Sequence, residues 1–266
     1  MIVFKNKWNV IKKSSAEIEA MKEAGRISAK VLREVGARVQ PGISTLELDR
    51  ICESLIRLEG GTPAFKGLYG FPGSICASIN DEVVHGIPSA DVILQEGDVI
   101  SIDTGATVDG WVGDNAWTFP VGKISAEKQA LLDVTEECMW AGLDAMRQGN
   151  HLYDIGRAVQ DIAESHGYGV VREYVGHGIG RVMHEDPNVP NYYDKKNDLL
   201  LEPGMVFAIE PMINMGTYKT VQGSDGWIVR TADGLPSAHF EKMVACTEDG
   251  PVILTTEPDH ESPVSD

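Results

Sequence analysis

Two similar phrases of sequence, about a hundred residues apart, each combine a histidine with a carboxylate. The first runs from Val84-His85-Gly86-Ile87 to Asp103, and the second runs from Gly176-His177-Gly178-Ile179 to Glu210. In both phrases the acid follows a glycine by six residues and ends an apolar run. A repeated pairing of histidine and acid predicts two related half-folds that face one another across a shared site.

Two further acids extend this set. Asp114 lies eleven residues after Asp103, beyond the typical hairpin dipeptide Asp109-Gly110, so we expect the two carboxylates on adjacent strands. In the second half, Glu241 in His239-Phe240-Glu241-Lys242 joins Glu210 as a second acid beside apolar residues. Such acids, at the ends of apolar runs, cost free energy unless they are protonated, paired with arginine or bound to a cation. Four acids and one neutral imidazole would be balanced by two divalent cations.

The donor types indicate which cations fit. Structural zinc sites use mostly thiolate and imidazole, whereas an oxygen-rich set with one histidine favours harder ions. Manganese, iron(II) or cobalt(II) are therefore the expected ions, with zinc or nickel as alternatives. A single acid at a strand end is usually a turn or cap residue, so the hypothesis depends on the repeat and on the hairpin spacing rather than on any one residue.

The surrounding pattern predicts the elements that must position these groups. Apolar residues at helical spacing predict helices over residues 15–38, 44–60, 126–147 and 151–165. Helix starts are indicated by Ser14 with Glu17, by Ser44 with Glu47 and by Asn150 as a cap. Short apolar or β-branched runs predict strands over residues 74–79, 83–84, 99–102, 106–108, 117–120, 169–175, 206–213, 227–231 and 240–247.

Two helices followed by antiparallel sheet, twice over, indicate an α+β fold with pseudo-twofold symmetry, with the helices outside and a curved sheet inside. No long linker or low-complexity tract divides the chain. We therefore expect a single domain over residues 1–266, with pseudo-repeats at about 14–122 and 123–255. The polar, proline-containing stretch 257–266 is expected to be a frayed tail.

Composition excludes several classes of protein. The chain has 266 residues, 23 basic against 40 acidic, and a formal charge of -17, which disfavours direct binding to nucleic acid. The opening residues 1–7 lack the apolar core of a secretion signal, and no apolar run approaches the ~20 residues of a membrane span. Four scattered cysteines form no CxxC pair. We expect a soluble, cytoplasmic protein with reduced thiols.

Six segments, in order and spacing, resemble a type I methionine aminopeptidase. They are Asn80–Pro88, Ile102–Gly105, Gly113-Asp114, Gly176–Gly180, Ile209–Pro211 and Phe240-Glu241. The resemblance covers about residues 14–255 and implies the pita-bread fold, in agreement with the duplicated pattern of helices and sheet. The chain has no long extension before Ser14 and no long insertion in its second half, so it is similar to the short bacterial form rather than to type II enzymes.

The resemblance also implies a role for each acid. Asp103 would bind one metal ion alone, His177 and Glu210 would bind the other, and Asp114 and Glu241 would bridge the two. A metal-activated water would then attack the first peptide bond, with Glu210 taking its proton.

Two more histidines and an apolar pocket follow from the same resemblance. His85 would hydrogen-bond the scissile amide nitrogen, and His184 would stabilise the developing oxyanion. The implied substrate-binding residues are Phe65, Leu68, Phe71, Cys76, His85, Met183, His184 and Trp227. Several relatives carry cysteine and tyrosine where this chain has Phe65, Leu68 and Phe71, so we expect a drier pocket wall. Without the resemblance, these aromatic residues would be assigned to the core and His184 to a solvated loop.

The implied function is removal of the initiator methionine from nascent proteins and peptides with a small second residue. Nascent N-termini would be the partners, with transient ribosome association as a further possibility. Three alternatives remain: a proline-directed peptidase of the same fold, such as prolidase; a non-catalytic pita-bread protein that binds a partner chain; and a carboxylate cluster that only stores or senses a cation.

Overall fold

The computed structural model describes residues 8–256. The expected frayed tail over 257–266 and the opening segment 1–7 lie outside these residues. Within residues 8–256, no helix is both long enough and apolar enough to cross a membrane.

Four α-helices form close to the predicted positions. Their bounds are Ser15–Gly36 for α1, Thr45–Leu58 for α2, Ala126–Asp144 for α3 and Leu152–Ser165 for α4, and a short 3-10 helix, η1, spans Leu68–Gly70. The capping box predicted at the start of α1 is confirmed, because the Glu17 backbone N–H donates to the Ser14 hydroxyl and the Glu17 carboxylate accepts from the Ser14 N–H.

The predicted cap of α4 is wrong. His151, rather than Asn150, occupies the N-cap position, and its backbone N–H donates to the Asp154 carboxylate at 2.8 Å. Asn150 instead donates its side-chain amide to the Ala145 carbonyl at 3.0 Å. The same carbonyl, at the C-cap of α3, also accepts from the Arg147 N–H at 2.8 Å, so the asparagine completes the preceding helix rather than starting the next one.

The strands form four antiparallel sheets. The first contains β1 (Thr62–Pro63), β4 (Val99–Val108) and β2 (Ile75–Ile79), with β5 (Trp111–Pro120) also paired to β4. The largest has the order β15 (Gly250–Ile253), β14 (Lys242–Thr247), β9 (Val206–Ile209), β7 (Gly176–Gly178) and β8 (Glu185–Val189). The two smaller sheets are β13 (Ser237–His239), β10 (Met212–Asn214) and β6 (Gly169–Val170), and β11 (Thr220–Gln222), β12 (Val229–Thr231) and β3 (Glu82–Val84).

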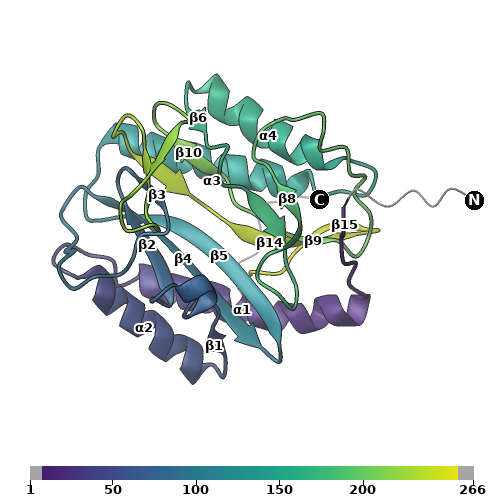
Figure 1. Ribbon diagram of the computed structural model, residues 1–266, viewed down its shortest axis with the longest axis horizontal. Coiled ribbons are helices and arrows are strands. Elements are labelled where there is room, and N and C mark those ends of the chain that lie inside the picture. Colours follow the sequence, from purple (N-terminus) through teal and green to yellow (C-terminus); the bar gives the residue numbers. More distant parts are fainter. Residues whose placement is uncertain (1–7, 257–266) are drawn as a thin grey trace, which may run out of the picture.

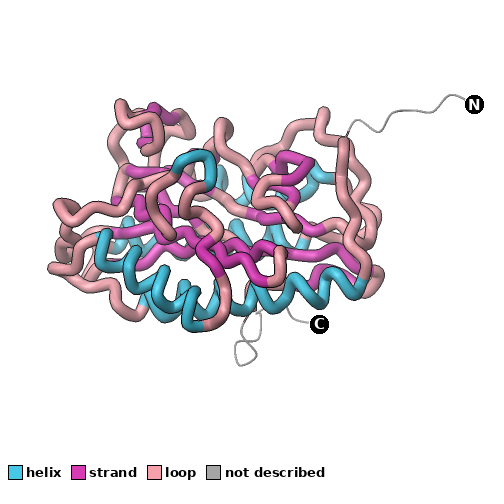
Figure 2. The backbone as a smooth tube through the Cα atoms, turned by 60° about the horizontal axis from the view of Figure 1, so that its bottom comes forward, coloured by secondary structure: helices cyan, strands magenta, loops and turns pink. Residues whose placement is uncertain are grey.

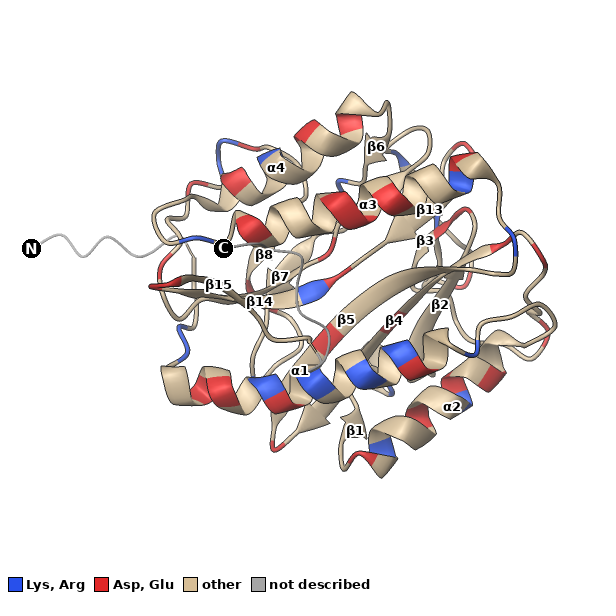
Figure 3. Cartoon of the chain, turned by 180° about the vertical axis from the view of Figure 1, so that it is seen from behind, with Lys and Arg blue, Asp and Glu red and all other residues tan. Residues whose placement is uncertain are grey.

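The helices gather on one side of the strands, and the opposite side is built largely from loops (Figure 2). Helices α1 and α2 belong to the half that holds β4 and β5, and α3 and α4 belong to the half that holds β9 and β14 (Figure 1). The outward faces of the helices carry the charge: α1 alternates acidic and basic residues, whereas α3 and α4 are mainly acidic (Figure 3). The arrangement confirms the predicted α+β fold with helices outside and sheet inside.

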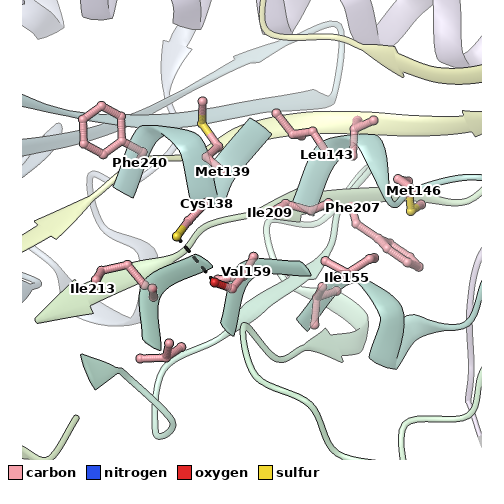
Figure 4. Close-up of a cluster of buried hydrophobic side chains, with 14 of the residues drawn as sticks. Cys138, Met139, Leu143, Met146, Ile155, Val159, Phe207, Ile209, Ile213 and Phe240 are labelled. Atoms are coloured by element: carbon pink, nitrogen blue, oxygen red, sulfur yellow. Dashed lines mark hydrogen bonds between the residues drawn. The ribbon is translucent and has the colours of Figure 1, made fainter. Parts of the chain in front are cut away.

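Each helix pair covers its own buried core. One core joins α1 and α2 to β4 through residues such as Ile27, Leu48 and Ile100, and the other joins α3 and α4 to β9. In the second core, the Cys138 thiol lies 3.5 Å from the Val159 carbonyl, next to Ile209 (Figure 4). Two cores of similar composition are the structural counterpart of the sequence repeat.

Two predicted strands are shorter than expected. The run 169–175 pairs with β10 at Gly169 and Val170, and the Val171 N–H also donates to the Met212 carbonyl at 3.1 Å, after which residues 172–174 form a bend. The run 206–213 divides into β9 and β10 at Glu210-Pro211. Because proline has no N–H to donate to a sheet, the ladder stops at this dipeptide. The interruption lies at one of the predicted metal ligands.

Helix α1 and strand β5 approach so closely at one point that only glycine fits. A Cβ atom at Gly113 would lie 2.2 Å from the Ala24 carbonyl oxygen, which is a backbone atom of α1. We expect Gly113→Ala to lower the free energy of unfolding by ~1–3 kcal/mol, because neither backbone can move without disturbing the core. Urea denaturation measures this change.

Gly61→Ala is the matched control for this substitution. A Cβ atom at Gly61 would lie 3.3 Å from its nearest neighbour, the Cγ2 methyl group of Ile56, a much longer approach than the 2.2 Å at Gly113. The control should therefore lose much less stability. Equal losses in the two variants would show that the contact between α1 and β5 is not the cause.

Candidate metal centre

The hairpin between β4 and β5 positions the first two acids. Asp109 and Gly110 both have positive φ, at 48° and 76°, as a tight hairpin turn requires. In the resulting register Asp103 lies opposite Ala116, and Asp114 lies opposite Gly105. The prediction that the hairpin places the two acids on adjacent strands is confirmed, with a diagonal rather than a direct pairing.

The second half contributes its groups through β7, β9 and the segment before β14. The Glu241 N–H donates to the Ala116 carbonyl at 2.9 Å, and this bridge joins the segment to β5. His177 in β7 pairs with Ala208 in β9, and β9 ends immediately before Glu210. Residues from both halves of the chain therefore meet: Asp103, Asp114 and His177 lie within strands, whereas Glu210 and Glu241 stand at the ends of β9 and β14.

The side chains converge on one centre. Nε2 of His177 lies 3.7 Å from Oδ2 of Asp114 and 3.5 Å from Oε1 of Glu210. One donor atom from each of Asp114, His177 and Glu241 lies within 4.8 Å of the other two. Asp103 adjoins this group, since the charges of Asp114 and Glu210 help to raise the pKa of its carboxyl. The structure thus brings together all five predicted ligands.

Because the carboxyl groups of this cluster are buried, their ionised forms are unfavourable unless a cation is bound. Desolvation is the largest cause that raises the pKa of Asp114 to about 7, and it raises the pKa of Asp103, Glu210 and Glu241 well above the usual range. One buried oxygen of each of Asp103, Asp114 and Glu241 has no hydrogen-bond partner. Unpartnered carboxylate oxygens that face one another are suited to divalent cations, so the donor set fits such ions.

The imidazole of His177 has the protonation state that a neutral metal ligand requires. Burial lowers the pKa of its imidazole to about 4, so the ring is uncharged near neutral pH. Its Nδ1 lies 2.9 Å from the Gly178 carbonyl oxygen, which assigns the ring proton to Nδ1. Nε2, on the side of Asp114 and Glu210, therefore presents a lone pair.

A cavity lies directly against these ligands. Its wall includes Phe65, Leu68, Tyr69, Phe71, Cys76, Val84, His85, His184, Trp227 and His239, together with Asp103, Asp114, His177, Glu210 and Glu241. Phe71 and Trp227 meet edge to face, with ring centroids 5.1 Å apart. Seven of the eight predicted substrate-binding residues thus share one cavity. Within the described residues, Met183 is not part of this wall and packs in the buried cluster beside Phe65.

The two predicted catalytic histidines lie at this cavity. His85 has a positive φ of 62° and packs edge-on against Tyr174, with ring centroids 5.7 Å apart. The His184 ring lies 4.5 Å from the His177 ring. Burial is the largest cause that lowers the pKa of both side chains. Both imidazoles are therefore neutral groups beside the metal ligands near neutral pH.

The loop that carries His184 is anchored by a buried ion pair. Glu185 follows His184 directly in the chain. Its side chain is 6% exposed and pairs with Lys13 at 2.6 Å, and it also accepts from the Arg181 N–H at 3.1 Å. The partner lies 172 positions away along the chain, so local sequence gives no indication of it.

Three residues of the cavity wall were not predicted: Tyr69, Val84 and His239. Tyr69 stacks on His184, with ring centroids 5.8 Å apart, from the 3-10 helix η1, and its own positive φ of 51° is not evident in the sequence. The sequence does contain an indication that His239 lies at the site. It stands two residues before Glu241, and residues at this spacing share a face of an extended chain.

Comparison with known proteins identifies relatives of high similarity. The sequence profile of metallopeptidase family M24 matches residues 19–248. A methionine aminopeptidase of Clostridium acetobutylicum is 49% identical over 246 residues, which cover 92% of this chain and 98% of that protein. Methionine aminopeptidase 1 of Bacillus subtilis is also 49% identical, over 92% of this chain and 99% of that protein.

Comparison with solved structures agrees with the comparison of sequences. Methionine aminopeptidase from Thermotoga maritima superimposes with a TM-score of 0.91 at 40% identity, over 93% of this chain and 100% of that one. Prolidase from Pyrococcus furiosus gives a lower TM-score of 0.73 at 25% identity, and the match covers only 65% of that longer chain. The fold is thus the pita-bread fold, and the chain belongs to metallopeptidase family M24, within its methionine aminopeptidases.

Proposed function

We propose that this protein is a metal-dependent aminopeptidase that releases methionine from the N-terminus of nascent proteins and peptides with a small second residue. The observation that carries the proposal is the position of the acid cluster, which forms one end of a cavity whose remaining wall is mainly apolar and aromatic. A site of this kind can bind an apolar first side chain next to the groups that cleave the bond after it. The identity of nearly half of all residues to methionine aminopeptidases supports this assignment.

Asp103, Asp114, His177, Glu210 and Glu241 would hold two divalent ions, with manganese, iron(II) or cobalt(II) as the favoured occupants and zinc or nickel as alternatives. When bound, such ions lower the pKa of water and polarise a carbonyl group. Two ions balance the formal charge of the four carboxylates. The buried carboxylate oxygens without hydrogen-bond partners support the binding of cations at this place.

The protein's own side chains supply the remaining steps. By analogy with the family, Glu210 would accept the proton of the attacking water, since its carboxylate lies at the cavity beside the other predicted ligands. His85 would hydrogen-bond the scissile amide nitrogen, and His184 would stabilise the oxyanion. The cavity would hold the methionine side chain among Phe65, Leu68, Phe71, Cys76, Met183 and Trp227, with Met183 in a supporting position behind the wall.

The decisive experiment compares substrates. Purified protein supplied with Mn²⁺ or Co²⁺ should release methionine from Met-Ala-Ser at least about 100-fold faster than it releases leucine from Leu-Ala-Ser, because the cavity accepts an unbranched chain. It should leave X-Pro dipeptides intact, whereas a prolidase would cleave them. Metal that raises the melting temperature without any peptide turnover would favour the cation-storage alternative and contradict the proposal.

Trp227 offers a test of the pocket. Trp227→Ala should raise KM for Met-Ala-Ser by about tenfold, because it removes the ring that packs against Phe71 in the cavity wall. Trp140→Phe, in α3 and outside the cavity wall, is the control and should leave KM unchanged. Steady-state kinetics on both variants measures these KM values. Equal KM values for Trp227→Ala and the unmodified protein would exclude Trp227 from substrate binding.

We also propose that the whole chain acts as one catalytic domain in the cytoplasm, where new N-termini emerge. The formal charge of -17 supports action on the peptide without direct binding to nucleic acid. Any transient contact with the ribosome would then be expected to involve protein surface. Co-sedimentation with ribosomes that present a nascent chain, with and without nuclease treatment, tests this expectation.

A further inference from the structure

His239 is a buried histidine of the cavity that the proposed mechanism does not use. The residue is 2% exposed, and within residues 8–256 its Nε2 is one of the few buried side-chain atoms without a hydrogen-bond partner. An unpaired buried ring nitrogen carries a desolvation cost, so it calls for an explanation.

The imidazole faces Glu210. Nε2 of His239 lies 3.7 Å from Oε2 of Glu210, while Nε2 of His177 lies 3.5 Å from Oε1 of the same carboxylate. Glu210 therefore lies between two imidazole rings, one beside each of its oxygens. His177, itself one of the predicted ligands, adjoins Oε1, and His239 adjoins Oε2.

The main chain of His239 is fixed on both sides. Its N–H donates to the Thr118 hydroxyl at 2.9 Å, and the same hydroxyl donates to the His239 carbonyl at 2.9 Å. On the opposite edge, the register of β13 and β10 pairs His239 with Met212, two residues after Glu210. The two side chains are thus held on neighbouring segments, and a small rotation would shorten 3.7 Å to the ~3 Å of a hydrogen bond.

We propose that His239 is a positioning residue for the metal site, and that its Nε2–H donates a hydrogen bond to Oε2 of Glu210. This bond holds the carboxylate so that Oε1 faces His177 and the bound ion. The inference rests on the proposed metal site and extends it to a residue outside the five ligands. Partners of this kind typically change metal affinity or activity by 10–100-fold when they are removed.

Variants at one position separate this role from simple packing. A glutamine amide can place an N–H where Nε2 lies, whereas the shorter asparagine amide reaches only as far as Nδ1. Calorimetric titration of the metal-free protein with Mn²⁺ should therefore give an affinity for His239→Gln within about threefold of the unmodified protein. His239→Asn and His239→Leu should bind Mn²⁺ about 10–100-fold more weakly.

The Glu210→Gln background adds a second readout. If His239 acts through Glu210, His239→Leu should cause no additional loss of Mn²⁺ affinity in that background. Equal losses for His239→Gln and His239→Leu, or a full additional loss in Glu210→Gln protein, would overturn the proposal. Wild-type affinity in His239→Leu would also overturn it.

The ring tautomer can be measured without any substitution. Long-range proton–nitrogen NMR of the unmodified, metal-free protein should show His239 with its proton on Nε2. A proton on Nδ1 alone would leave Nε2 as a lone pair, in the state of a metal ligand, and would refute the hydrogen bond. This measurement tests the proposed hydrogen bond between His239 and Glu210 even if some variants fail to fold. A wild-type protein that takes up no Mn²⁺ would instead refute the proposed function.

Discussion

Asp114→Asn is expected to reduce methionine release by about 1000-fold or more and, at the same time, to stabilise the metal-free protein. Asp114 lies at the middle of the ligand group, within 4.8 Å of both His177 and Glu241 through its donor atom. A neutral amide cannot supply the anionic oxygen that two cations would share, so water activation should be lost.

The stability change has the opposite sign because burial opposes ionisation of this group. Burial raises the pKa of Asp114 to about 7, so ionising it in the folded, metal-free protein costs free energy. Removing the ionisable group should raise the free energy of unfolding by ~1–4 kcal/mol at pH 8 in the presence of a chelator. Peptide assays and urea denaturation measure the two effects separately.

Asp109→Asn is the matched control in the same hairpin. Asp109 is an exposed turn residue with φ 48°, a conformation that asparagine also adopts readily. Both activity and stability should remain close to those of the unmodified protein. Asp114→Asn that retains activity would remove Asp114 from the metal site, and an unchanged stability would show that its carboxyl is not strained in the metal-free state.

The metal-free protein should lose stability steeply as the pH rises above about 6.5. Asp103, Glu210 and Glu241 have folded-state pKa values raised well above the usual range, and burial is the largest cause. A carboxyl with a raised pKa keeps its proton in the folded state after the unfolded state has lost it. Its contribution to stability therefore falls as the pH rises.

The buried histidines oppose this trend at lower pH. Burial lowers the pKa of His177 to about 4 and that of His239 to about 3. Between those values and 6.5, the unfolded state binds these protons and the folded state does not, so stability rises with pH. Above 6.5 the histidine contribution is constant, and only the decrease from the carboxyls remains.

Each proton retained in this way lowers the free energy of unfolding by about 1.4 kcal/mol per pH unit. Urea denaturation in chelator should therefore show a shallow pH dependence between 5 and 6.5 and a steep decline towards 8. Saturating Mn²⁺ should abolish the decline, because metal binding displaces the protons. If the metal-free protein were equally stable at pH 6.5 and pH 8, the pKa values of Asp103, Glu210 and Glu241 would not be raised by burial, and the prediction would be wrong.

The helices and the first hairpin could be predicted because their determinants are local. Ser14 and Glu17 form their capping box within one turn, and Asp109-Gly110 closes a hairpin between strands that are adjacent in the sequence. The ends of elements were predicted less well where a distant partner decides them. The strand predicted over 169–175 is short because its hydrogen bonds to β10 involve only the start of the run, up to Val171.

The sequence by itself indicated the pseudo-twofold α+β pattern and a set of four acids that converge with one imidazole, because a repeated histidine and acid pattern and a hairpin spacing are visible along the chain. The resemblance to methionine aminopeptidases then selected His177 among the five predicted ligands. Only the tertiary structure decided which groups support those ligands. The Lys13–Glu185 pair behind His184 and the approach of His239 to Glu210 are contacts between segments far apart in sequence or on different strands. Burial, which raises the carboxyl pKa values and makes the site suitable for cations, likewise arises only when both halves close around it.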